Sequence, residues 1–222
     1  MGFFRKLFSS KQPEPQEAAK PPDIAPELAP ALEAFQAGRY DEAIAIAAPY
    51  ADRQADANRL CALAYSSAGR YPDAFPYWLA LFEQEPSAHN ACQLASTSVM
   101  CGEIERGEAW FQKIHEINQE AGEATHVAYL TNFLSAFGQS GHLAEALPYL
   151  TILRDIYGGL HVTDSTFLHL RGVPFFSAFL EKSLEMLQPT QSAEEIKTWY
   201  EELKGKLDEE GEAQLVDWIA QI

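Results

Sequence analysis

The sequence predicts an all-α fold in which helical hairpins stack into a solenoid. Four glycines recur 31, 33 and 39 residues apart, at Gly38, Gly69, Gly102 and Gly141. This spacing is the period of helical hairpin arrays. A large apolar residue follows each glycine by two positions and a small residue follows it by five, so one unit is repeated. The chain has 222 residues, 47% of them hydrophobic, which is enough to bury a sizeable core.

The residues after each glycine suit a turn followed by a second helix. Glycine readily adopts the positive φ at which many helices end. In the second repeat, Gly69 is followed by Tyr71, Ala74 and Trp78. Because Ala74 and Trp78 are four residues apart they share one helix face, and the small alanine lets two helices approach closely. We expect this face to be buried.

These repeats resemble the tetratricopeptide repeat family. The matching residues are Ala62, Tyr65, Gly69, Tyr71, Ala74, Trp78 and Pro86 in repeat two, Leu94, Ala95, Gly102 and Phe111 in repeat three, and Phe137, Gly141 and Ala146 in repeat four. The first repeat departs from the pattern, with Pro30 in its first helix and Ala47 where an aromatic is usual. The resemblance spans roughly residues 24–158 and implies a superhelix of helical hairpins.

In that family the first helices of the hairpins line a concave face that holds another protein. The resemblance places a partner-binding groove at Arg59, Leu63, Ser66, His89, Gln93, Ser96, Met100, Thr131, Asn132, Ser135 and Gln139. Small hydroxyl and amide side chains leave room for another chain and hydrogen-bond to its backbone. An ordinary solvated helix face is the alternative. Chaperone-type members grip a C-terminal carboxylate with several basic residues, but this groove offers only Arg59.

Residues 1–22 are predicted to be an arm in front of the folded body. Its first nine residues are apolar and basic, with Phe3, Phe4, Arg5, Lys6, Leu7 and Phe8. The prolines that follow cannot continue a helix, so residues 10–22 form a tether. The basic segment has two open destinations, a membrane surface or a docking place on protein, and its few charges predict weak, salt-sensitive membrane contact.

Residues 23–188 form the predicted repeat array, and residues 189–222 form an acidic helical cap. Extra residues around 118–125, between repeats three and four, are expected to lengthen a helix pair or its loop, and a degenerate fifth hairpin is expected after Leu160. Ser192 and Glu195 predict a capping box that opens a helix reaching about Leu207, followed by a last helix from about Glu209. Solenoids need such a terminal unit with a polar outer face.

The composition limits the kinds of partner and the location that we expect. The formal net charge of −16 disfavours nucleic acid, because phosphate neutralisation needs clustered Lys and Arg, and it suits a basic or neutral protein. Three cysteines lack metal-like spacing and indicate a reducing compartment. No stretch is apolar enough to span a bilayer. We therefore expect a cytoplasmic protein, with the inner face of the membrane as the alternative location through the arm. The composition does not predict the oligomeric state.

No catalytic or cofactor-binding motif is present, so we predict no enzyme, no cofactor and no metal site. His161 and His169 lie eight residues apart, which is wide for shared metal ligation. The leading hypothesis is a non-catalytic interaction module that holds a partner protein or peptide on its concave face. An acidic inhibitor that neutralises a basic effector is the alternative. An enzyme with an unrecognised site around His161, Asp164 and His169 is the weakest hypothesis.

Overall fold

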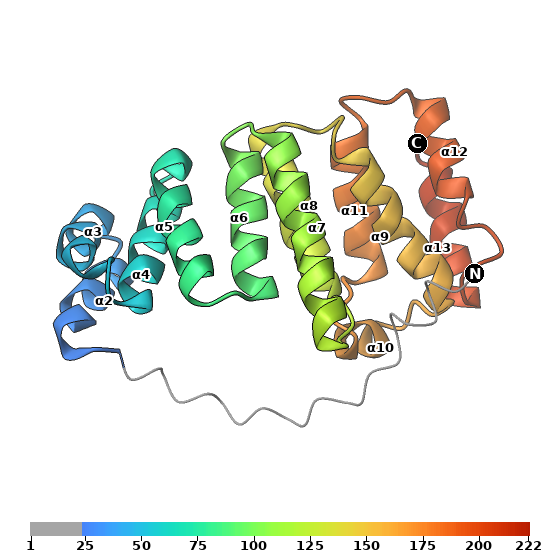
Figure 1. Cartoon of the computed structure of the whole chain (residues 1–222). Helices are drawn as coiled ribbons and strands as arrows, with labels where there is room; N and C mark the ends of the chain where they lie inside the picture. Colours follow the sequence, from blue (N-terminus) through green and yellow to red (C-terminus); the bar gives the residue numbers. More distant parts are fainter. Residues whose placement is uncertain (1–23) are drawn as a thin grey trace. The chain divides into compact units, whose positions relative to one another are not determined.

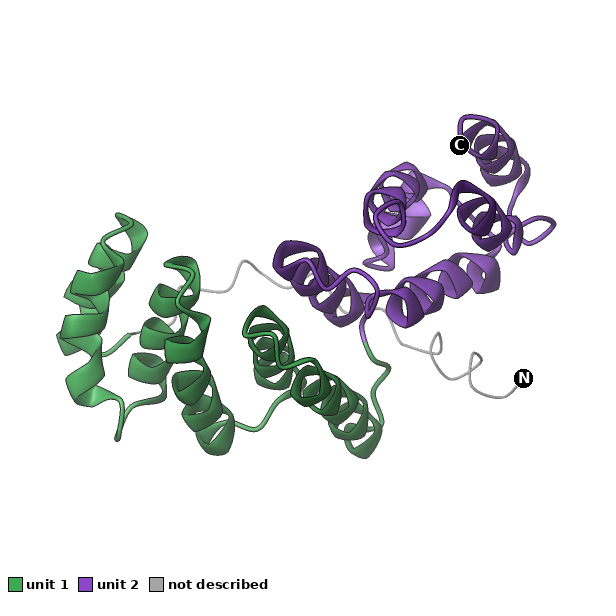
Figure 2. Ribbon diagram, turned by 90° about the horizontal axis from the view of Figure 1, so that it is seen from above, with its two compact units in different colours: residues 1–125 green, residues 126–222 purple. Residues whose placement is uncertain are grey.

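A computed structural model describes residues 24–222, and every regular element within that range is helical. The predicted all-α class is therefore confirmed. The described chain divides into two compact units, residues 24–125 and residues 126–222 (Figure 2). The basic-aromatic segment Phe3–Phe8 and its tether lie outside the described residues, so their destinations stay predictions. Within residues 24–222 no helix combines the length and apolarity needed to cross a bilayer.

The first unit consists of three helical hairpins in chain order (Figure 1). Short 3-10 turns precede the first hairpin and follow it, at η1 Pro26–Leu28 and η2 Ala48–Tyr50. The paired helices are α2 Ala29–Gln36 with α3 Tyr40–Ala47, α4 Ala55–Ser67 with α5 Tyr71–Gln84, and α6 Ala88–Met100 with α7 Ile104–Ala121. Pro30 stands in the first turn of α2, where its missing N–H costs no helical hydrogen bond.

The glycine turns of these hairpins share one backbone geometry. Gly38, Gly69 and Gly102 have φ of 74°, 72° and 78°. The N–H of the residue after each glycine donates to a carbonyl five residues back at 2.9 Å, as in Arg70 to Tyr65. This bond satisfies a carbonyl at the end of the first helix, and the left-handed φ reverses the chain into the second. The predicted role of the glycines is confirmed.

Buried residues connect successive hairpins through the unit. Ala74 is fully buried and Trp78 is 2% exposed, and both belong to one cluster with Ala62 of α4, Leu81 of α5 and Leu94 of α6. The predicted buried face of α5 is therefore confirmed. The 18-residue α7 is the longest helix described, and it ends at Gly122 with φ of 71°. Of the extra residues around 118–125, residues 118–121 belong to α7 and the others follow it.

The second unit contains six helices. They are α8 Val127–Ser140, α9 Leu147–Leu160, α10 Ser165–Leu170, α11 Phe176–Leu187, α12 Ala193–Glu201 and α13 Glu209–Ile219. Gly141 between α8 and α9 has φ of 78°, and Gly172 between α10 and α11 has φ of 65°. A short helix, a glycine turn and a longer helix thus follow Leu160. Whether α10 and α11 form a fifth hairpin stays a prediction.

The predicted helix from Ser192 starts where expected but ends earlier. Ser192 and Glu195 form the full capping box at its start. The extension to Leu207 was wrong, because the helix ends at Glu201 and the chain then turns, with Gly205 at φ of 73°. The turn brings Leu203 to 1% exposure in the core. Leu203 is thus buried as its helical spacing predicted, but a turn and not a continued helix buries it.

Polar contacts between distant residues fix the C-terminal helices to α9 and the loop after it. The carboxylate of Asp208 accepts from the backbone N–H of Thr163 at 2.7 Å and from its hydroxyl at 2.5 Å. The same carboxylate accepts from the N–H of Gly211 at 2.9 Å and so caps α13. Burial opposes the charge of Asp208, but these hydrogen bonds hold its pKa below the usual value.

Candidate functional site: polar faces of the first helices

Helix α6 is buried along its length except at four positions. These positions are the predicted groove residues His89, Gln93, Ser96 and Met100, and all other residues of α6 are buried. Because they are spaced by four, three and four residues, they form one stripe along the helix. The exposure therefore agrees with a binding face, while the binding itself stays a prediction. We call these four residues the α6 stripe.

The polar groups of the α6 stripe are available to another chain. Neither the amide of Gln93 nor the hydroxyl of Ser96 has a hydrogen-bond partner among residues 24–222. By contrast, Asn90 on the buried side donates to the Glu85 carbonyl at 2.8 Å. An amide offers both donors and an acceptor, and a hydroxyl offers one donor and two lone pairs. The stripe can therefore serve both polar groups of a peptide bond.

On α4, the three predicted groove residues are half-buried and already have partners within the first unit. Arg59 pairs with Asp56 and also with Glu85, at 2.6 Å in the second case. Ser66 accepts from the Trp78 indole at 3.3 Å. Leu63 packs against the Trp78 cluster. The one basic residue of the predicted groove is thus neutralised by two carboxylates.

Helix α8 carries the remaining predicted groove residues and belongs to the second unit. Asn132, Ser135 and Gln139 are exposed, and Thr131 is half-buried. The Gln139 amide donates to the Ser135 hydroxyl at 2.9 Å, and Thr131 donates to its own helix at the Ala128 carbonyl. Asn132 has no hydrogen bond among the described residues. These side chains form a solvent-facing polar stripe on α8.

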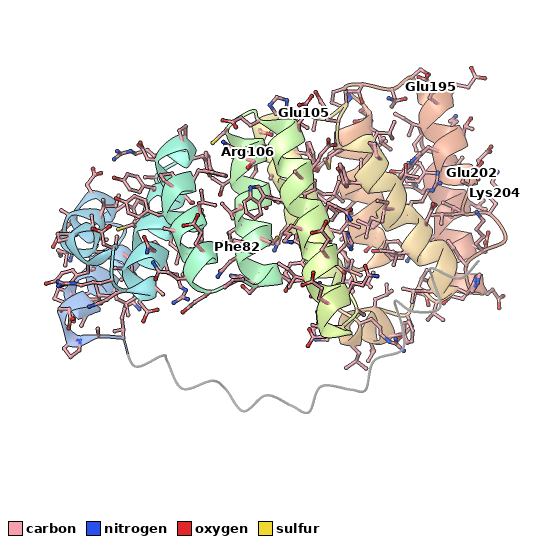
Figure 3. The ribbon with its side chains drawn as sticks, viewed as in Figure 1. Phe82, Glu105, Arg106, Glu195, Glu202 and Lys204 are labelled. Atoms are coloured by element: carbon pink, nitrogen blue, oxygen red, sulfur yellow. The ribbon has the colours of Figure 1, made fainter. Side chains whose placement is uncertain are left out.

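A contact that sequence reasoning missed holds α6 against its neighbours. Arg106, in the first turn of α7 (Figure 3), donates to the buried Ser98 hydroxyl at 3.1 Å. Its guanidinium carbon also lies 3.8 Å from the centre of the Phe75 ring of α5. Ser98 in turn donates to the Leu94 carbonyl at 2.8 Å. One side chain thus joins α5, α6 and α7 on the face of α6 opposite the stripe. No motif in the sequence pointed to this arginine.

The two histidines considered for chemistry belong to different elements of the second unit, His161 to the C-terminal end of α9 and His169 to α10. The His161 Nδ1 lies 2.6 Å from the Lys206 carbonyl, and His169 is exposed on the short helix α10. Within residues 24–222 no three His, Cys, Asp or Glu side chains are grouped as a metal site. Cys61 and Cys92 are buried thiols on α4 and α6, and burial raises the pKa of Cys61 to about 11. Such a thiol is protonated at neutral pH and serves as a core residue.

Two surface hollows in the described chain lie away from the α6 stripe. One, of about 450 Å³, is formed in the first unit by the turns that contain Arg39 and Arg70. The other, of about 480 Å³, is formed in the second unit by Arg154 and one face of α12. In the first hollow both arginines are paired, Arg39 with Glu42 and Arg70 with Asp73 and Asp41.

Comparison with known proteins returned no matching protein-family model and no matching curated protein.

Proposed function

We propose that this chain is a non-catalytic, tetratricopeptide-like interaction module that holds an extended segment of a partner protein on the α6 stripe. The observation that carries the proposal is the exposure pattern of α6, in which only His89, Gln93, Ser96 and Met100 reach the surface. A helix enclosed on its other sides is a rigid platform, and rigid platforms lose little entropy when they bind.

The chemistry of the stripe suits an extended peptide. Gln93 and Ser96 have unused hydrogen-bonding groups that match the N–H and C=O of a peptide backbone. Met100 adds a flexible apolar contact that adapts to different side chains. A groove for an apolar helix would instead present several Leu, Met or aromatic residues. The partner we propose is therefore a peptide segment recognised mainly through its backbone.

The neutralised state of Arg59 supports recognition of an internal segment and not of a free C-terminus. Gripping a terminal carboxylate needs basic groups that are free to pair with it. Arg59 is already paired with Asp56 and Glu85. We propose the cytoplasm as the setting, because Cys61, Cys92 and Cys101 form no disulfide among the described residues.

A site-specific crosslinking experiment tests the proposed function. A photoreactive amino acid replaces Gln93 in one version of the full chain and Gln112, which is exposed on α7, in a matched control. After irradiation in the native cells, position 93 should capture one defined protein that position 112 does not capture. The purified partner should then bind Gln93→Ala about ten-fold more weakly than the unaltered chain, and Gln112→Ala equally well. Equal capture at both positions, or unchanged affinity of Gln93→Ala, would contradict the proposal.

A further inference from the structure

The second unit has a surface hollow of about 480 Å³ where α9 meets α12. It is lined by Arg154 of α9 and by one face of α12 with its C-cap, comprising Glu194, Glu195, Thr198, Trp199 and Glu202. Figure 3 shows Glu195 near the start of α12 and Glu202 towards its other end. An aromatic ring, a buried guanidinium and three carboxylates therefore line one site.

The indole of Trp199 is held in a fixed orientation. Its Nε1–H donates to the Thr151 hydroxyl at 3.0 Å. The Arg154 guanidinium carbon lies 5.2 Å from the ring centre, and the Tyr200 ring packs edge-on at 5.0 Å. A half-buried aromatic ring that is oriented by its neighbours offers an apolar surface for the stem of a Lys or Arg side chain.

Arg154 retains hydrogen-bonding capacity although it is only 9% exposed. Of the five N–H bonds of a guanidinium, two donate to the Asp155 carboxylate and one to the Trp199 carbonyl, at 2.8 to 3.0 Å. The other two have no partner among the described residues. Each guanidinium nitrogen of Arg154 thus has one acceptor within the chain, and the two remaining N–H bonds can donate to a ligand in the hollow, such as a backbone carbonyl. The charge of Arg154 is offset by its pair with Asp155.

None of the three carboxylates at the hollow pairs with a Lys or Arg among the described residues, but the Glu195 carboxylate is engaged in hydrogen bonds. Glu195 accepts from the N–H and the hydroxyl of Ser192 in the capping box. Glu194 and Glu202 are exposed, and neither pairs with a Lys or Arg among residues 24–222. They are eight positions apart, which corresponds to about 12 Å along a helix. Four residues of extended chain span about the same distance.

We propose that this hollow binds a basic segment of a partner protein with two Lys or Arg residues about four positions apart. One basic side chain pairs with Glu194 and the other with Glu202, a side-chain stem packs on Trp199, and a backbone carbonyl of the segment accepts from Arg154. The site lies in the other unit from the α6 stripe and does not depend on the proposed function. The net charge of −16 favours encounter with such a partner.

A pair of synthetic peptides tests the proposal on the full chain. The basic probe is acetyl-Ala-Lys-Ala-Ala-Ala-Lys-Ala-amide, and the control peptide has Gln in place of both Lys. Binding is followed by NMR at the Trp199 indole N–H, which is assigned by comparison with Trp199→Phe. The basic peptide should shift this resonance in a saturable way and bind more weakly as salt is raised, whereas the Gln peptide should cause no shift. Equal shifts with both peptides would overturn the proposal.

Matched charge variants locate the site. Glu194→Gln with Glu202→Gln should weaken the basic peptide about five-fold or more, whereas Glu209→Gln with Glu210→Gln, which removes the same charge from α13, should leave the affinity nearly unchanged. Equal losses in the two double variants would mean non-specific attraction and overturn the site.

In the full chain, Arg5→Gln with Lys6→Gln should have no effect on the affinity for the basic peptide. A gain in peptide affinity in that variant would instead identify the chain's own N-terminal segment as the occupant and overturn the assignment to a partner.

Discussion

The Nε–H of Arg106 donates to the buried hydroxyl of Ser98 at 3.1 Å, joining the start of α7 to the inner face of α6. The side chain of Ser98 is fully buried, so its hydroxyl has no access to water. The bond lies on the opposite side of α6 from the stripe. The bond therefore helps to hold α6 in place. It lies away from any partner bound on the stripe.

We predict that Ser98→Ala destabilises the chain by about 1–2 kcal/mol, because the substitution removes a buried acceptor and leaves one donor of Arg106 without it. Urea unfolding measures the change. Ser67→Ala, at an exposed position at the end of α4, is the control and should change the free energy of unfolding by less than about 0.5 kcal/mol. Equal effects of the two substitutions would show that the Arg106 bond contributes little.

A second prediction concerns Gly211, where α13 approaches the loop after α9. A Cβ atom at this position would lie 2.5 Å from Thr163 Cγ2 and 2.8 Å from Thr163 Oγ1. Gly211→Ala should therefore destabilise the chain by about 1–3 kcal/mol, despite the better helix propensity of alanine. Thermal unfolding of Gly211→Ala alone and in a Thr163→Ala background forms the test, because the smaller residue at 163 removes the two nearest atoms and leaves the Asp208 Oδ1 atom, at 2.9 Å, as the nearest to the added Cβ. The penalty should be clearly smaller in that background.

Gly138→Ala provides the matched helical control for this experiment. Its nearest non-local atom would be the Met186 side chain at 4.0 Å, an ordinary contact. The substitution should stabilise the chain by up to about 1 kcal/mol through helix propensity. Destabilisation at Gly138 as large as that at Gly211 would mean that the close approach to Thr163 is not the cause.

A third prediction is a pH dependence that comes from Asp208. Its pKa is lowered in the folded chain, so the unfolded chain binds the proton more readily. The stabilisation is therefore complete above the ordinary aspartate pKa, near pH 4, and is lost as the pH falls through the lower folded value. The stability difference between the unaltered chain and Asp208→Asn should be largest near pH 7 and should shrink towards pH 2–3. Urea unfolding at several pH values measures it, and a constant difference would contradict the assignment.

A fourth prediction concerns the basic-aromatic segment Phe3–Phe8. Two or three basic charges contribute about 1 kcal/mol each near an anionic surface, so any membrane contact through this segment should be weak and lost at moderate salt. Co-sedimentation with vesicles that contain phosphatidylserine compares the full chain with Arg5→Gln combined with Lys6→Gln. The unaltered chain should sediment more at low salt only. Equal and negligible sedimentation of the two would exclude the membrane and favour docking on protein.

Features that depend on neighbouring residues were readable from the sequence. The turns at Gly38, Gly69 and Gly102 need only a residue that tolerates positive φ and the helix that precedes it. The residues of the α6 stripe were placed by the resemblance, and they share one face because they are spaced by three and four positions on a helix. The capping box at Ser192 is likewise set by two residues three positions apart.

The tertiary structure alone decided the features that join residues far apart in the chain. Arg154 reaches the Trp199 carbonyl across 45 residues, and Thr163 reaches Asp208 across the same separation. The early end of α12 belongs with these contacts, because the turn after Glu201 puts Leu203 into the core and brings Asp208 to Thr163. Local periodicity favoured a helix that continued through this turn. The burial of Leu203 and the hydrogen bonds between Asp208 and Thr163 stabilise the turn more than a longer helix would be stabilised by its own hydrogen bonds. This balance depends on residues that are distant in the chain, so the local sequence does not reveal it.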